Sequence, residues 1–311
     1  MGLSLRKNSN RGTVGLDLDG GFVSAVQASA DGVSKAASFD LAPGIISDGE
    51  VTDVHALTEA LRDFFKDNGL PRRVRLGIAN QQIVVRQLDI PKIDEEKERA
   101  AAVRFQAAEA IAMPLDEVVL DHQVIGEVQS PEGSPRLRVV VVAARESMIA
   151  RMVEAVRGAG LRPEGIDLNA FALVRALASQ TDSTETARVY CHLGGVTNLA
   201  IAIGTTCLFT RPLSAQWDSE DENVASALAE EIRLSIDFYM AQPEARWVGE
   251  IVLSGPGSQR EGLSEELSGL IEVPVTVAEP LGRLQVDRIP AGEDATRHTI
   301  ATGLALGAAA A

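Results

Sequence analysis

Cysteine is scarce in this chain, with only Cys191 and Cys207, and both lie in apolar, strand-like runs. This scarcity argues against a disulfide-stabilised secreted fold and favours buried thiols in a reducing compartment. Histidine is almost as rare, since it occurs only at positions 55, 122, 192 and 298. None of these spacings is typical of metal ligands, so a zinc site of histidines and cysteines is disfavoured.

Positive charge is also in short supply. Lysine and arginine total 29 against 44 acidic residues, which leaves a net charge of −15. Such a surface repels polyanions, because neutralisation of phosphates supplies most of the affinity of proteins for nucleic acid. We therefore expect no nucleic-acid partner.

Long apolar runs are absent as well. The sequence has no stretch of about 18 uncharged apolar residues, the length that a membrane-spanning helix requires. The segment from Met1 to Lys7 lacks the apolar stretch of a signal peptide. Hydrophobic residues make up 45% of the chain, which is ordinary for a folded globular protein. We expect a cytoplasmic protein with no direct membrane span.

What the sequence does contain is a repeated α/β pattern. Residues 14–29 alternate apolar and small residues around Gly20-Gly21, the pattern of two strands joined by a glycine turn. Residues 54–65 carry apolar side chains at helical spacing, and this predicted helix ends at Asn68-Gly69. Strand-like runs follow it up to residue 88. The order strand, helix, strand predicts an α/β layer arrangement.

A second glycine hairpin begins at Val189. The segment Asp17-Leu18-Asp19-Gly20 aligns with His192-Leu193-Gly194-Gly195 at an offset of 175 (192 minus 17). Each copy is a strand, a glycine turn and a returning strand with an apolar face, so the chain is predicted to be internally duplicated. We assign residues 1–185 to a first lobe and residues 186–311 to a second lobe.

The second lobe is predicted to be α/β as well. Apolar residues recur at helical spacing over 218–242. A strand over 250–254 then leads into Gly255-Pro256-Gly257, and a helix is predicted over 299–309. We expect this terminal helix to pack back toward the first lobe.

Residues 91–167 form a self-contained run within the first lobe. A helix is predicted over 94–112, followed by two strands and a helix over 146–159. Pro91 and a turn at Pro163-Glu164-Gly165 bracket the run. We interpret it as an inserted α/β subdomain, and a simple continuation of the first lobe is the alternative.

The glycine turns indicate a place for phosphate. Backbone N–H groups can approach an anion closely at a glycine, because no side chain intervenes. Two related turns and a third at 254–257 therefore predict a two-lobe nucleotide cleft. Its candidate nucleotide-binding residues are Asp17, Gly20, Gly21, Gly194, Gly195, Thr197, Gly255 and Gly257. Asp17 is also the candidate contact for Mg²⁺-bound water, and its alternative role is to cap the hairpin turn.

Three segments resemble the phosphate and adenosine motifs of the actin superfamily, namely Val14 to Leu18, His192 to Gly194 and Ile251 to Gly255. Further segments are similar to the PilM family of type IV pilus assembly, and they lie at 42–50, 77–86, 113–121, 235–239 and 301–306. The resemblance covers nearly the whole chain. It implies an α/β, actin-like (ribonuclease H-like) two-lobe duplicated fold, with an inserted α/β subdomain in the first lobe and a reduced small subdomain in the second.

The resemblance also implies a function. It implies a cytoplasmic scaffold, peripheral at the inner face of the cytoplasmic membrane, that binds the cytoplasmic N-terminal peptide of a PilN-like bitopic membrane protein. It further implies contacts with other pilus assembly proteins and a site for ATP and Mg²⁺. Self-association, and a role in a related secretion system instead of a pilus, are left open.

The predicted nucleotide site departs from the family pattern. Asp19 stands in place of a glycine, and its carboxylate would lie near phosphate oxygens, where like charges repel. Ser24 stands where the family has a lysine, and His192 stands where it has an aspartate. Pro256 removes one backbone donor from the third turn. We therefore expect weak ATP binding and poor hydrolysis, and a vestigial ATPase at most.

Two other members of the superfamily offer alternative functions. The segment Gly15 to Gly21 also resembles the opening of small bacterial sugar kinases, but the cysteine-rich zinc loop of those enzymes is missing from this sequence. An FtsA-like cell-division protein needs an amphipathic membrane-binding tail, and the alanine-rich C-terminus offers no basic face. A pilus scaffold is therefore preferred to both.

Overall fold

The computed structural model describes residues 12–29, 32–179, 182–215, 217, 223–243, 245–279 and 294–309. The chain forms two compact units. The first unit consists of residues 1–80 and 153–311, and the second of residues 81–152. No helix in the described ranges combines the length and the apolar character needed to cross a membrane.

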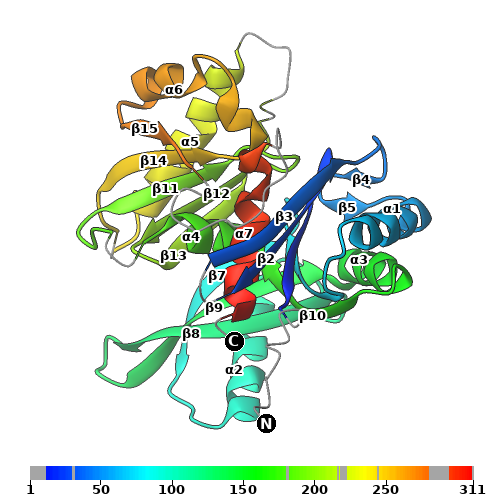
Figure 1. Cartoon of the computed structure of the whole chain (residues 1–311). Coiled ribbons are helices and arrows are strands. Elements are labelled where there is room, and N and C mark those ends of the chain that lie inside the picture. Colours follow the sequence, from blue (N-terminus) through cyan, green and yellow to red (C-terminus); the bar gives the residue numbers. More distant parts are fainter. Residues whose placement is uncertain are drawn as a thin grey trace, which may run out of the picture. The chain divides into compact units, whose positions relative to one another are not determined.

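The first unit contains a five-stranded sheet that includes the first glycine hairpin (Figure 1). Its strands are β1 (Val14–Leu18), β2 (Phe22–Ser29), β3 (Gly32–Asp40), β6 (Arg73–Ile78) and β10 (Arg162–Leu168). They lie in the order β10-β6-β1-β2-β3. Strand β2 runs antiparallel to its neighbours β1 and β3, and β6 and β10 run parallel to β1.

A second sheet in the same unit repeats this design. Its strands are β11 (Ala187–His192), β12 (Asn198–Ile203), β13 (Thr206–Pro212), β14 (Val248–Ser254) and β15 (Val275–Val277). They lie in the order β15-β14-β11-β12-β13, with three antiparallel strands and two strands parallel to β11. Strand order and strand direction therefore match the first sheet, and the predicted duplicated α/β fold is confirmed.

The two glycine hairpins differ in length by one residue. Asp17 pairs with Ser24 in the first hairpin, and His192 pairs with Asn198 in the second. Six residues (18–23) separate the first pair, and five residues (193–197) separate the second. The offset of 175 therefore holds on the incoming strands and falls to 174 (198 minus 24) on the returning strands.

Helices cover both faces of the second sheet. On one face, α5 (Val224–Met240) and α6 (Leu263–Ile271) enclose a core with the alternate strand residues Val189, Cys191, Leu199 and Ile201. On the other face, α4 (Asn169–Leu177) and α7 (Thr299–Ala309) pack against the residues in between, Tyr190, Ala200 and Ala202. Burial on both faces explains why these strands are apolar throughout instead of alternating with polar residues.

The terminal helix α7, red in Figure 1, lies between the two sheets. Ala301 and Ala305 face the first sheet, where they join a core with Val26 and Val33. Gly15 in β1 makes this close approach possible, because a Cβ atom there would lie 2.0 Å from the Ala301 carbonyl oxygen. On the far side of the sheet, α1 (Val54–Asp67) reaches β3 through the Phe39 and Phe64 rings, whose centroids are 4.8 Å apart.

Two arginines satisfy carbonyl groups of α7. Arg175 Nη1 donates to the Gly303 carbonyl at 2.9 Å, and Arg75 Nη1 donates to the Gly307 carbonyl at 3.1 Å. The Asp167 carboxylate lies 3.0 Å from Arg175 and 3.5 Å from Arg75, so it holds both guanidinium groups in place. Gly307 lies in the last turn of α7, where carbonyls have no partner within the helix and cationic donors stabilise the helix end.

The second unit is a three-stranded antiparallel sheet with a helix on it. Its strands are β7 (Val84–Pro91), β8 (Val118–Gln129) and β9 (Pro135–Arg145), in the order β7-β9-β8. The helix α2 (Glu96–Ala110) packs on this sheet through Val103 and Ala107. Asp89 and Arg138 form an ion pair of 2.9 Å across neighbouring strands. The chain leaves the unit within α3 (Glu146–Gly158).

The structure differs from the predicted local elements near residue 163. The segment Pro163-Glu164-Gly165, predicted as a turn, lies inside β10, and its pairing with β6 shifts register between Pro163 and Gly165. A proline cannot donate a ladder hydrogen bond, so a bulge at this point is expected. Residues 153–167 thus lie in the first unit, whereas the inserted subdomain over 91–167 stays a prediction.

Several short elements complete the fold. Strands β4 (Ile46–Ser47) and β5 (Glu50–Val51) form a small hairpin, and two short helices, η1 (Pro256–Gln259) and η2 (Ala295–His298), precede α6 and α7. The helix predicted over 218–242 is observed as α5 from Val224, and residues 218–222 lie outside the described residues. Strands β3 and β13 were not predicted from the sequence, because the burial of their residues does not alternate with a period of two.

Candidate functional site

The first glycine turn is closed by its own backbone and by Asp19. The Asp19 amide donates to the Phe22 carbonyl at 3.0 Å, and the Gly21 amide donates to Asp19 Oδ1 at 3.0 Å. An aspartate that bonds to a backbone N–H two residues on is a common way to fix a turn. The Asp19 carboxylate is therefore part of the turn itself.

The second glycine turn meets the first at the same carboxylate. The Gly195 amide donates to Asp19 Oδ2 at 2.6 Å. A Cβ atom on Gly194 would lie 2.6 Å from Asp19 Oδ2, and one on Gly195 would lie 2.5 Å from Asp19 Oδ1. Only glycine fits at these two positions, because any side chain would displace the carboxylate. The predicted meeting of the two turns is thus present, with Asp19 between them.

Asp17 lies behind this contact in the interior. It is 1% exposed, and its Oδ1 accepts from Asn169 Nδ2 at 3.4 Å. Its Oδ2 has no hydrogen-bond partner among the described residues. Burial raises the pKa of Asp17 well above its ordinary value, the negative charge of Asp19 raises it further, and the Asn169 hydrogen bond lowers it. This carboxyl therefore resists ionisation.

The pKa of Asp19 is raised as well, by burial of its carboxyl group. The hydrogen bonds from the Gly21 and Gly195 amides and the positive charge of Arg297 oppose this effect and lower the pKa. Of the two neighbouring carboxyl groups, Asp19 therefore has the partners that stabilise a negative charge. Asp17 has only a long bond from one amide.

His192 occupies the position in the second hairpin that Asp17 occupies in the first. It is 2% exposed, and its Nδ1 lies 3.1 Å from Ser254 Oγ on the paired strand β14. Its Nε2 has no partner among the described residues. Burial lowers the pKa of His192 to about 4, so the ring is neutral at pH 7.

The third turn packs directly against the second. Gly255 has a φ of 83°, and a Cβ atom there would lie 2.6 Å from the Leu193 carbonyl oxygen. The Gly257 amide donates to this same carbonyl at 3.0 Å. Trp217 covers the junction, because its Nε1 donates to the Gly194 carbonyl at 2.9 Å and its ring lies 2.4 Å from the position of a Gly257 Cβ.

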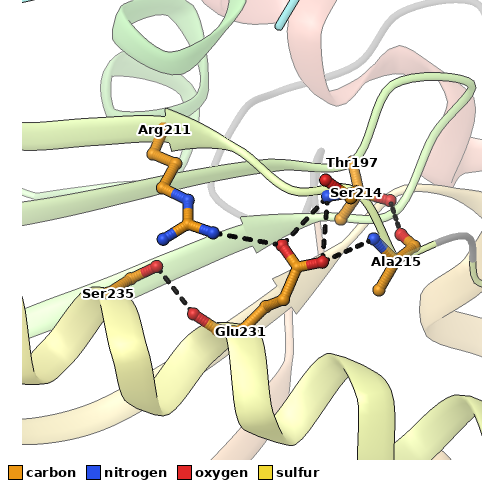
Figure 2. A network of polar contacts seen from close by, with 6 residues as sticks. All are labelled: Thr197, Arg211, Ser214, Ala215, Glu231 and Ser235. Carbon is orange, nitrogen blue, oxygen red and sulfur yellow. Dashed lines mark hydrogen bonds and ion pairs between the residues drawn. The ribbon is translucent and has the colours of Figure 1, made fainter.

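Glu231 of α5 anchors the segment that follows β13 (Figure 2). Its carboxylate accepts from the amides of Ser214 and Ala215, each at 2.9 Å, and from the Arg211 guanidinium at 3.4 Å. Thr197 Oγ1 donates to the Ala215 carbonyl at 3.1 Å. The predicted nucleotide contact Thr197 thus bonds to this anchored segment.

The structure places the predicted site residues in two groups. The six turn glycines gather around Asp19, His192 and Leu193, whereas Asp17 and Thr197 are buried and point to Asn169 and to Ala215. Asn169 was missed by the sequence analysis, because it lies in α4 and no motif surrounds it. Ser24 was singled out only as a lost lysine, and in the structure its Oγ lies 2.7 Å from His298 Nδ1.

A magnesium nucleotide does not fit the two turns in this arrangement. The Gly195 amide is used by Asp19, and the Asp19 carboxylate fills the space that the glycines leave open. A phosphate at the same amide would meet a like charge at short distance. Within the described ranges, no three histidine, cysteine, aspartate or glutamate side chains gather closely enough to hold a metal ion.

The duplicated sheets and their meeting glycine turns define an actin-like fold. A solved protein from Bacteroides thetaiotaomicron, described as having an actin-like ATPase fold and unknown function, has a TM-score of 0.50 and 14% identity to this chain. The comparison covers 90% of this chain and 95% of that one. The chain belongs to the type IV pilus assembly protein PilM family, whose model matches residues 15–199 and 222–309.

Two further solved structures are similar over nearly the whole chain. A chain of a PilM-PilN type IV pilus biogenesis complex has a TM-score of 0.82 and 24% identity, with 96% of this chain and 99% of that chain covered. The cytoplasmic domain of EpsL, an inner membrane component of the type II secretion system of Vibrio cholerae, has a TM-score of 0.51 and 14% identity. That match covers 95% of this chain and 94% of the EpsL domain.

Proposed function

We propose that this protein is a cytoplasmic scaffold of type IV pilus assembly that binds the cytoplasmic N-terminal peptide of a PilN-like bitopic membrane protein. The observation that carries the proposal is the likeness to a PilM-PilN complex at a TM-score of 0.82 over 96% of this chain. Membership of the PilM family over most of the chain supports it. Recognition of a short extended segment is a common function of soluble scaffold domains.

The proposed partner would also determine where in the cell this protein lies. A PilN-like protein anchored in the cytoplasmic membrane would hold the scaffold at the inner face of that membrane, next to other pilus assembly proteins. The net charge of −15 supports an indirect attachment, because an acidic surface is not attracted to anionic lipid.

For nucleotide we propose weak ATP binding and little hydrolysis. Binding would use the glycines of the three turns and would require Asp19 to move away from Gly195. Asp17, the proposed contact for Mg²⁺, would have to ionise, which its burial opposes. The bond of 2.6 Å between Asp19 and Gly195 supports weak binding, because a phosphate would have to replace it. The neutral ring of His192 supports poor hydrolysis, because it offers no carboxylate to hold metal-bound water.

Calorimetry tests the scaffold proposal directly. The full chain is titrated with a synthetic peptide that has the cytoplasmic N-terminal sequence of the PilN-like protein from the same cell. A peptide of the same composition in scrambled order is the control. Saturable binding of the native peptide alone supports the proposal, and equal or absent binding of the two peptides contradicts it.

A further inference from the structure

The contact between the two glycine turns consists of backbone amides that donate to one carboxylate, that of Asp19. Gly195 is exposed, yet its amide donates a short bond of 2.6 Å to a side chain that lies 176 residues away in sequence (195 minus 19). The other oxygen of the same carboxylate accepts from Gly21 at 3.0 Å. Asp19 therefore joins the two turns through two different oxygens, one for each turn.

This arrangement is that of an anion held by glycine amides. Backbone N–H groups at glycine turns form concave sites for anions, and a hydrogen bond to a charged acceptor is stronger than one to a neutral acceptor. Here the anion is a carboxylate of the chain itself. Burial raises the pKa of Asp19, and the hydrogen bonds from the two glycine amides and the positive charge of Arg297 oppose this effect. Arg297 in turn is held by Asp40 at 2.6 Å and lies over the Phe22 ring at 5.1 Å.

The glycines around the carboxylate leave space for it, because they carry no Cβ atom. Cβ atoms on Gly194 and Gly195 would each lie within 2.6 Å of an Asp19 oxygen, so the absence of side chains on the second turn makes room for this carboxylate. The first turn adds Gly20, whose missing Cβ would lie 4.0 Å from the Gly195 Cα. The two turns are therefore complementary to each other with Asp19 in place.

We propose that Asp19 is an internal anion that occupies the phosphate position between the two glycine turns, so that the two sheets of the first unit are joined there without nucleotide. That this position is a phosphate position rests on the proposed function, whereas the bond between Asp19 and Gly195 is independent of it. The carboxylate has two effects. It links β1–β2 to β11–β12 at the turns, and it repels a phosphate group that approaches the Gly195 amide.

Amide hydrogen exchange tests the link in the full chain without any ligand. Although Gly195 is an exposed residue, its amide should exchange slowly in the native protein, because it is bonded to Asp19. In Asp19→Ala we expect its exchange to accelerate about tenfold or more, in line with the loss of one bond to a charged acceptor. Asp19→Asn keeps the size of the side chain and should give an intermediate rate. Unchanged exchange at Gly195 in both variants overturns the proposal.

Asp63→Asn is the matched control, because Asp63 is exposed on α1 and its replacement removes one negative charge far from the turns in sequence. It should leave the exchange of Gly195 unchanged. Accelerated exchange in this control as in Asp19→Asn would overturn the proposal, because a general effect of charge would then explain the result.

Calorimetry with Mg-ATP tests the second effect. Replacement by the family residue in Asp19→Gly should tighten Mg-ATP binding by about tenfold or more relative to the native chain, because the repelling charge is gone. Equal affinity of the two proteins overturns the claim that Asp19 excludes phosphate. The same proteins are then titrated with the PilN-like peptide. If the native chain does not bind the peptide, the proposed function is refuted, and the result at Gly195 is unaffected.

Discussion

His192 in the second hairpin is the counterpart of Asp17 in the first, and both are buried titratable groups that favour their neutral form. Each lies on the incoming strand of its hairpin, shortly before the glycine turn. His192 pairs with Asn198 on the returning strand, and Asp17 pairs with Ser24. Burial raises the pKa of Asp17 and lowers the pKa of His192 to about 4. Burial thus favours the neutral form at the duplicated position in both copies, through opposite shifts of the pKa.

Asp17→Asn should stabilise the protein at neutral pH. The folded-state pKa of Asp17 is raised, so its contribution to stability is fully present below the ordinary aspartate pKa and is lost as pH rises through the folded-state pKa. The amide has no charge to lose. We therefore expect the free energy of unfolding at pH 7, measured by urea unfolding, to be higher for Asp17→Asn than for the native protein.

The gain from Asp17→Asn should shrink as the pH falls below the ordinary aspartate pKa, because the carboxyl group is then neutral in both the folded and the unfolded state. Asp63→Asn, at an exposed position, serves as the control and should change stability little at either pH. A loss of stability in Asp17→Asn at pH 7 would mean that the native carboxylate is charged and well partnered.

His192→Gln should remove a pH dependence of stability. The folded-state pKa of His192 is lowered from 6.5 to about 4, so its contribution is present above pH 6.5 and is lost as pH falls toward 4. The total loss is roughly 3 kcal/mol for a difference of this size. Urea unfolding of both proteins from pH 7.5 to 4.5 measures it as the difference between the two slopes.

His55→Gln is the matched control for His192→Gln, because the His55 side chain is 83% exposed. It should follow the native pH profile. A native profile in His192→Gln would contradict the account of a buried neutral ring.

Glu231→Ala should destabilise the second sheet by roughly 2–4 kcal/mol, because it leaves the amides of Ser214 and Ala215 without their acceptor. Glu230→Ala, one position earlier on the exposed face of α5, should cost little. Urea unfolding gives both values. A difference below the error of the measurement would show that water replaces the carboxylate at no cost.

Gly303→Ala should disrupt the packing of α7 on α4. A Cβ atom at Gly303 would lie 1.8 Å from the Ala172 carbonyl oxygen, so the two helices must separate, and we expect a loss of about 2 kcal/mol or more. Gly269→Ala in α6 is the control, because nothing lies within 4 Å of its Cβ position. Alanine favours a helix, so this variant should gain up to about 1 kcal/mol. Thermal unfolding that ranks the two variants the other way would contradict the packing.

The repeated fold could be predicted because its signal is local. A strand, a glycine turn and a returning strand occur twice at a fixed offset, and the end of α1 is marked by Asn68 and Gly69. The strand β10 could not be predicted, because Pro163 and Gly165 are typical of turns and only pairing with β6 holds them extended.

The position of the glycine turns could be predicted for the same reason, whereas their role as nucleotide contacts stays a prediction. The six turn glycines do gather, since each follows a strand of one of the two sheets. The bond from Gly195 to Asp19 could not be predicted, because it depends on how two turns far apart in sequence pack together. From the sequence we predicted that the Asp19 carboxylate would lie near a phosphate and repel it. The structure shows in addition that this carboxylate accepts a hydrogen bond from the Gly195 amide.

The dissociation constant of the PilN-like peptide, measured by calorimetry on the native chain with and without saturating Mg-ATP, tests the central claim most directly. Because Asp19 joins the glycine turns without a nucleotide, we predict saturable binding with the same dissociation constant in both conditions. Peptide binding that requires Mg-ATP, or that tightens tenfold or more when it is added, would contradict the account.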